Sequence, residues 1–124
     1  MDEVEGVSCR LGTHEFQEGI DGSVVVFHVM AMLDSLFIWI GNQQPSNFSN
    51  LALAMHTKYE TGATALNIFG KDTDSTSSNI AKKIASKTKK QIYVSYNLAS
   101  DETPMLSAVE LRLMQEMKDR PECF

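Results

Sequence analysis

A chain of 124 residues, 43% hydrophobic and 22% charged, has the length and composition of one globular domain, which excludes two separate cores. Its formal net charge of -5 disfavours binding to a nucleic acid, because contacts to the phosphate backbone require a surplus of lysine and arginine. The apolar runs are too short to cross a bilayer, and the two cysteines, Cys9 and Cys123, lack CxxC spacing. We therefore expect a single domain, 1–124, in a reducing compartment, without a membrane segment.

The first part of the chain is predicted to contain a partly exposed strand. Residues 1–6 are acidic and are expected to form a flexible terminus, without the basic and apolar regions of an export signal. Residues 7–20 then alternate loosely between apolar and polar side chains and end at Asp21-Gly22, a typical turn pair.

The next two segments are predicted to form a hairpin of buried strands. Residues 23–33 and 36–40 are apolar at both even and odd positions, so each strand is expected to be covered on both faces. Asp34-Ser35 lies between them, and both residue types favour a tight turn.

Two further strands are predicted after the polar loop at 42–49. In residues 51–56, leucine and methionine alternate with alanine and histidine, which indicates a strand, with a helix as the alternative. Residues 64–69 form the next expected strand, which ends at Gly70.

The period then changes to that of a helix. Residues 71–78 are rich in Asp, Ser and Thr and are predicted to cap an amphipathic helix that runs to about Thr88. Residues 91–98 alternate clearly and form the sixth expected strand. Thr103 as N-cap and Pro104 in the first turn then open a second helix that extends to about Arg120.

This order, β-β-β-β-β-α-β-α, predicts an α+β fold with a six-stranded, mainly antiparallel sheet and two helices. Two helices can cover one face of such a sheet. Because the second and third strands are apolar on both faces, the other face needs a second cover. Either the sheet folds over on itself or a partner subunit supplies that cover.

Both helices carry surfaces with two interpretations. The second helix is apolar over a wide arc because Leu111 and Met114 point away from its main stripe, so it is either buried on two sides or forms an interface edge. The lysines between Lys82 and Lys90 form either a solvated helix face or a docking patch for an acidic protein surface.

Catalytic, metal and cofactor sites are not indicated. His14, His28 and His56 lack the spacing of a zinc site. His28 with Asp34-Ser35 is the only local candidate for nucleophilic catalysis, and a hairpin turn explains Asp34-Ser35 better. The segment 70–75 lies where phosphates often bind, but it lacks the upstream glycine of a P-loop and carries two aspartates. We therefore expect a protein that binds other proteins and is not an enzyme.

Several segments together resemble the proteasome assembly chaperone 4 family. The similarity extends over about 26–124; the stretch before it, to Ser23, and the longer loop at 42–49 depart from the family pattern. The matching segments are Phe27-His28-Val29-Met30, Asp34-Ser35-Leu36-Phe37-Ile38-Trp39-Ile40-Gly41, Asn50-Leu51-Ala52-Leu53-Ala54-Met55 with Tyr59, Gly70 with Asp74-Ser75-Thr76-Ser77-Ser78, Lys87-Thr88-Lys89-Lys90-Gln91, Val94-Ser95-Tyr96-Asn97-Leu98 and Pro121-Glu122-Cys123-Phe124.

The resemblance implies a non-catalytic chaperone that pairs with a similarly folded chain, a proteasome assembly chaperone 3-like subunit. The pair would promote assembly of the alpha ring of the 20S core proteasome, engage the fifth alpha subunit and dissociate as beta subunits are added. The implied location is the cytoplasm, with the nucleus as a second compartment. Homodimerisation in the absence of the partner stays open.

Candidate partner-binding residues are drawn from three segments of the chain. Four apolar residues are predicted for contact with the partner chain and three lysines for docking: Phe37, Trp39, Leu111 and Met114, and Lys82, Lys83 and Lys87. The alternative function is a small profilin-like or longin-like interaction module in trafficking or the cytoskeleton.

Overall fold

The computed structural model describes residues 12–20, 22–42, 48, 50–56, 63–70, 76–98 and 103–124. Its elements in chain order are β1 (Gly12–Ile20), β2 (Ser23–Ala31), β3 (Ser35–Asn42), β4 (Leu51–His56), β5 (Ala63–Phe69), α1 (Thr76–Thr88), β6 (Gln91–Tyr96), α2 (Thr103–Asp119) and a 3-10 helix, η1 (Pro121–Cys123). The predicted α+β class and element order are confirmed. The expectations for 1–11, 43–47 and 71–75 lie outside the described residues.

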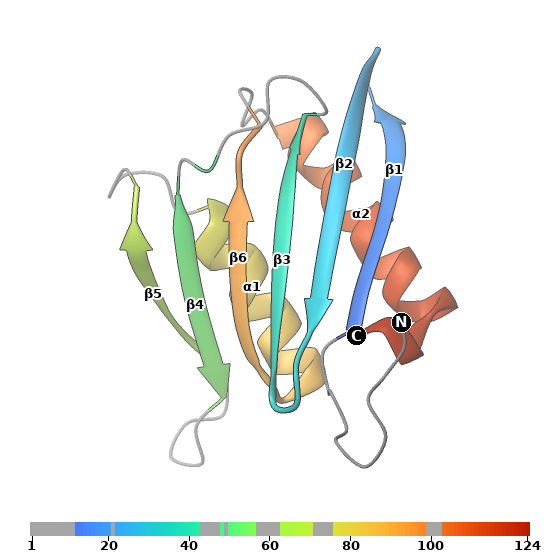
Figure 1. The fold of residues 1–124 in the computed structure, drawn as a ribbon. Coiled ribbons are helices and arrows are strands. Elements are labelled where there is room, and N and C mark those ends of the chain that lie inside the picture. The colour runs from blue at the N-terminus through green and yellow to red at the C-terminus, as the bar shows by residue number, and fades with distance from the viewer. Residues whose placement is uncertain are drawn as a thin grey trace.

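The six strands form one sheet in the order β1-β2-β3-β6-β4-β5, which Figure 1 shows face-on. All neighbouring pairs are antiparallel except β3 and β6, which run parallel. The sheet is therefore mixed, although mainly antiparallel as predicted. The single parallel pair arises because β6 follows α1, which crosses behind the sheet and returns the chain to the gap between β3 and β4.

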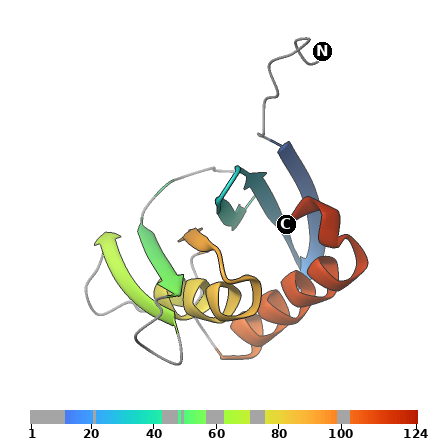
Figure 2. The ribbon, with the colours of Figure 1, turned by 90° about the horizontal axis from the view of Figure 1, so that it is seen from below.

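Both helices lie on the same face of the sheet, as Figure 2 shows. Helix α1 packs on β4, β5 and β6, whereas α2 packs on the side of β1. The core lies between the two layers, and its largest fully buried side chains are Phe27, Leu36, Ile38, Ile40, Ile80, Ile84, Ile92 and Leu113. None of the helices in the described part of the chain is long and apolar enough to span a membrane.

The β2–β3 hairpin is confirmed, but its second face is only partly covered. Val25 and Phe27 point toward the helices and are fully buried, as is Ile38 in β3. On the other face Val24 is 43% exposed, and Trp39 is only half-buried. The helices do not supply the expected cover of the second face, because both pack on the same side. Cover by a partner subunit stays a prediction.

Helix α1 begins at Thr76, so the predicted capping segment contributes its last three residues to the helix. The reason is a tertiary contact. The Ser77 hydroxyl donates a hydrogen bond to the side-chain carbonyl of Asn50, at the start of β4, and accepts one from the backbone N–H of Tyr96. Ser77 is thereby satisfied while it is buried inside the first turn of the helix.

Candidate functional site

The sheet face opposite the helices carries an uninterrupted row of apolar side chains. The strand register aligns Met30 with Phe37, Phe37 with Tyr93, Tyr93 with Leu53, and Leu53 with Leu66. The row crosses five adjacent strands, which at the usual strand spacing is roughly 19 Å. We call the surface around this row the open face.

The apolar side chains of the open face are incompletely buried. Leu66 is 63% exposed, and its neighbours Ile68 in β5 and Met55 in β4 are 44% and 39% exposed. The other members of the row are half-buried. A contiguous apolar surface of this kind is characteristic of a protein–protein interface.

The residues that alternate with the exposed ones along each strand explain why the open face is apolar and has no helix packed on it. In β4, Ala52 and Ala54 point toward the helices and have no exposed surface, while Leu53 and Met55 point away. Small side chains let α1 approach the sheet closely, so the large residues of the same strand are left on the opposite side.

One end of the open face contains a hollow of about 380 Å³, lined by Thr13, His14, Glu15, His28, Val29, Met30, Phe37, Trp39 and Phe48. Its aromatic rings are held in place by contacts with one another. The rings of Phe37 and Phe48 are stacked, with centroids 6.0 Å apart, and the His28 ring meets the Trp39 indole edge-on at 5.5 Å. Both pairs leave ring surface toward the hollow.

Gly41 determines how the Trp39 indole lies. A Cβ atom at Gly41 would lie 2.5 Å from Cη2 of the Trp39 ring, so the indole covers the glycine and lies along β3. Only glycine permits this close approach, which directs the ring over the sheet surface.

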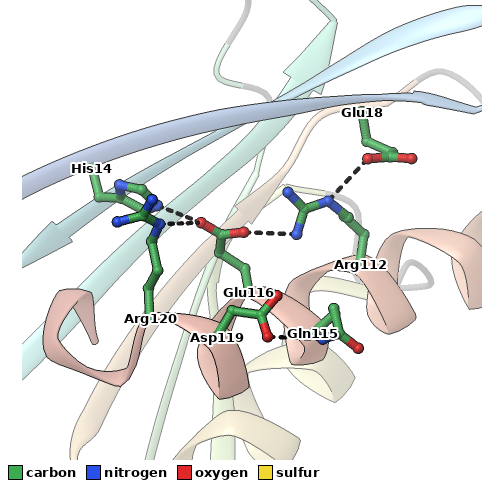
Figure 3. Close-up of polar contacts among 7 residues, drawn as sticks. All are labelled: His14, Glu18, Arg112, Gln115, Glu116, Asp119 and Arg120. Atoms are coloured by element: carbon green, nitrogen blue, oxygen red, sulfur yellow. Dashed lines mark hydrogen bonds and ion pairs between the residues drawn. The ribbon is translucent and has the colours of Figure 1, made fainter.

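The helix-covered face holds a charged cluster between β1 and α2, drawn in Figure 3. His14 Nε2 lies 2.7 Å from Glu116 Oε2, and the Arg112 guanidinium donates hydrogen bonds to Glu116 Oε1 at 2.8 Å and to Glu18 Oε1 at 3.0 Å. The Arg112 Cζ atom also lies 4.7 Å from the centroid of the Phe16 ring. These contacts attach α2 to the edge strand.

The contacts within this cluster shift the pKa values of Glu116 and Arg112. Burial by itself would raise the pKa of the Glu116 carboxyl, but the hydrogen bonds and charges of His14 and Arg112 lower that pKa on balance. Burial would likewise lower the pKa of Arg112, and its contacts with Glu116 and Glu18 raise that pKa on balance. Both groups are therefore stabilised in their charged forms, which suits an ion pair that supports the fold.

The predicted site residues do not form a single site. Phe37 and Trp39 lie on the open face, while the other five belong to the helices on the opposite side. Leu111 is 72% exposed, whereas Met114 packs partly against the core.

The three predicted lysines share helix α1 but differ in their contacts. Lys82 and Lys87 are exposed. Lys83 Nζ lies 2.6 Å from Glu110 Oε1 and so links the two helices. Their role in docking stays a prediction.

The residues of the nucleophile candidate have other contacts. Asp34 lies in the β2–β3 turn and Ser35 is the first residue of β3, where its carbonyl accepts a hydrogen bond from the Met32 N–H at 2.9 Å. His28 lies within β2, opposite Trp39, and its Nε2 is 3.6 Å from a Glu15 carboxylate oxygen. Among the described residues, no group of three or more His, Cys, Asp or Glu is arranged to hold a metal ion.

Sequence reasoning missed Met30, Tyr93, Leu53, Leu66 and Ile68 as members of the open face. The signal was present in β4, where large and small apolar residues alternate. Alanine at every second position indicates the side on which a helix packs, so the leucines and methionine indicate the other side.

A family model and two known proteins that are similar to this chain carry the same name. The family model described as proteasome assembly chaperone 4 matches residues 24–98. The chain is 39% identical over 111 residues to proteasome assembly chaperone 4 of Mus musculus, covering 90% of this chain and 89% of that protein. Its identity to the protein of the same name from Homo sapiens is 38%, with the same coverage.

A solved structure has the same fold. A chain from the crystal structure of a chaperone complex for yeast 20S proteasome assembly superimposes with a TM-score of 0.60. The alignment covers 89% of this chain and 95% of the yeast-complex chain, at 16% sequence identity.

Proposed function

This chain belongs to the proteasome assembly chaperone 4 family, and we propose from that membership and from its open face that it is a non-catalytic chaperone of proteasome assembly. The observation that carries the proposal is the apolar row from Met30 to Leu66, which no described part of the chain covers. A surface of this kind serves binding to another protein.

In this proposal the open face is covered by a second, similarly folded chain, a proteasome assembly chaperone 3-like subunit. Two sheets that pack face to face interdigitate their side chains at a separation of about 10 Å, and the row of apolar residues across five strands suits such packing. The chain shares its fold with a chain of a yeast chaperone complex, which supports a partner within a chaperone complex.

The pair is further proposed to act on the alpha ring of the 20S core proteasome, with the fifth alpha subunit as its contact. If the partner chain occupies the open face, the helix side stays available, and it carries the exposed Lys82 and Lys87. The complex would dissociate as beta subunits are added, which requires only that it bind the incomplete ring better than the completed one. Steric overlap with an incoming subunit provides that difference without any chemical step.

The proposed location is the cytoplasm, with the nucleus as a second compartment. Imaging of the tagged chain at its natural expression level tests this part separately, and confinement to another organelle would contradict it.

Co-purification tests the proposal as a whole. Tagged chain isolated from cells should recover a similarly sized partner together with proteasome alpha subunits, and depletion of the chain should reduce the amount of complete alpha rings. Recovery of cytoskeletal or trafficking proteins in their place would overturn the proposal in favour of an interaction module of the profilin-like or longin-like type.

The docking lysines provide a finer test. Lys82→Glu combined with Lys87→Glu should leave the partner chain bound and reduce recovery of alpha subunits, because the two side chains lie away from the open face. The matched control is the pair Lys82→Arg and Lys87→Arg, which keeps both charges. Equal recovery from both double variants would exclude these lysines from the alpha-subunit contact.

A further inference from the structure

The hollow on the open face combines aromatic walls with a carboxylate. Phe37, Trp39 and Phe48 supply the rings, and Glu15 of β1 stands at the rim with a side chain that is 60% exposed. Such a combination attracts a flat cation, because aromatic faces stabilise a positive charge and a carboxylate pairs with it.

The Glu15 carboxylate can accept stronger hydrogen bonds than those it receives within the described chain. The Glu15 carboxylate lies 3.6 Å from Nε2 of His28, which carries a charge only when it is protonated. At that separation the two groups make no close hydrogen bond. An apolar side chain that filled the hollow would desolvate the carboxylate without replacing its hydrogen bonds.

On the opposite face of β1, an arginine already binds to the same combination of an aromatic ring and a carboxylate. There the guanidinium of Arg112 lies over the Phe16 ring at 4.7 Å and donates to the Glu18 carboxylate at 3.0 Å. Strand β1 thus presents a glutamate beside aromatic rings on both faces, and on the covered face an arginine occupies the position.

We infer that the hollow receives an arginine side chain of the partner chain, with its guanidinium on the rings of Phe37 and Trp39 and paired with Glu15. This inference rests on the proposed function, since it assigns the partner's chemistry at that interface. Arginine fits better than lysine because a planar guanidinium both stacks on rings and forms two parallel hydrogen bonds with a carboxylate. A hollow of about 380 Å³ also admits the apolar neighbours of that arginine.

The site can be tested without the partner, because Trp39 is the only tryptophan of the chain and its fluorescence reports on the hollow alone. The probes are two capped tripeptides, Ac-Leu-Arg-Leu-NH2 and Ac-Leu-citrulline-Leu-NH2, added to the full-length chain. Citrulline has nearly the shape of arginine but no charge. We expect the arginine peptide to change the Trp39 emission saturably, with an affinity about tenfold above that of the citrulline peptide.

Glu15→Gln should remove most of this preference, whereas Asp119→Asn, which removes one negative charge from the exposed end of α2, should leave it intact. Equal affinities of the two peptides for the unaltered chain, or a preference that survives Glu15→Gln, would overturn the inference.

The same variants separate this inference from the proposed function. If the partner chain binds and Glu15→Gln leaves its affinity unchanged, the arginine site is wrong while the chaperone proposal stands. If no partner chain binds, the chaperone proposal fails, and the peptide titration still decides whether the hollow selects arginine.

Discussion

Asn50 connects three elements through one side chain. Its amide nitrogen donates to the Tyr96 carbonyl at 2.8 Å, and its amide oxygen accepts from the Ser77 hydroxyl and, at 3.3 Å, from the Tyr96 N–H. The substitution Asn50→Ala removes these hydrogen bonds in a partly buried place. We expect it to lower the free energy of unfolding by about 2–3 kcal/mol, measured by urea denaturation. The exposed Ser86→Ala in α1 is the control, with a change of about 0.5 kcal/mol or less; a similar result for Asn50→Ala would contradict the network.

Gly41 controls the position of the Trp39 indole. In Gly41→Ala the added methyl group would overlap the ring, so the indole must rotate away from β3. We expect a shift of the Trp39 emission maximum and weaker binding of the partner chain, with a fold that stays intact. The control is Gly19→Ala in β1, where a Cβ atom meets nothing within 4 Å and the emission should not change. An unchanged emission spectrum in Gly41→Ala would show that the ring does not depend on the glycine.

At the scale of elements, the attachment of α2 to β1 depends on an ionised Glu116. Because the contacts with His14 and Arg112 lower the pKa of Glu116 below its ordinary 4.5, the folded state favours the carboxylate. The resulting stabilisation is fully present above pH 4.5 and is lost as the pH falls through the lower pKa of the folded chain. The groups that pair with Glu116 are His14 of β1, Arg112 of α2 and Arg120, which directly follows α2. Glu18 of β1 faces the same cluster through its ion pair with Arg112.

Glu116→Gln should therefore destabilise the chain at neutral pH by about 1–3 kcal/mol and flatten the loss of stability on acidification. Urea unfolding across the acidic range measures both effects. Asp119→Asn, on the exposed end of the same helix, should change neither quantity appreciably. Parallel pH profiles of the unaltered chain and Glu116→Gln would mean that Glu116 does not carry the acid dependence.

The spacing of apolar residues along the chain predicted the strands and helices, because apolar residues recur with a different period in each of these two structures. They did not predict the position of β6 between β3 and β4, since the pairing of strands distant in the chain depends on the packing of α1. The early start of α1 was missed for a similar reason. Serine is a residue type that favours the N-cap position. Only the contacts of Ser77 with Asn50 and Tyr96 make it a buried helical residue.

The candidate site was predictable in part. Apolar residues at both even and odd positions of β2 and β3 indicated that the sheet has a second apolar face, and Phe37 and Trp39 lie on that face. That a partner covers this face stays a prediction. The rest of the row joins residues from strands that are not neighbours in sequence, such as Tyr93 and Leu53. Their alignment follows from the register in which the strands pair, and this register cannot be predicted from the sequence of any one strand.

At the scale of the whole molecule, the two sides have different surfaces. The helix side is charged and covers the core, whereas the open face is apolar and half-exposed. Each side nevertheless carries a strongly exposed leucine, Leu66 in β5 at 63% and Leu111 in α2 at 72%. This similarity allows the two candidate interfaces to be compared with one substitution.

Leu66→Lys and Leu111→Lys place the same charge on opposite sides of the molecule. Because both leucines are largely exposed, neither variant should unfold the chain, which thermal denaturation verifies. If the partner chain covers the open face, Leu66→Lys buries an ammonium group and loses apolar contact, so its affinity should fall about tenfold or more. Leu111→Lys should bind almost as the unaltered chain does in the same calorimetric titration. The reverse result would assign the partner to α2 and leave the row from Met30 to Leu66 to another protein.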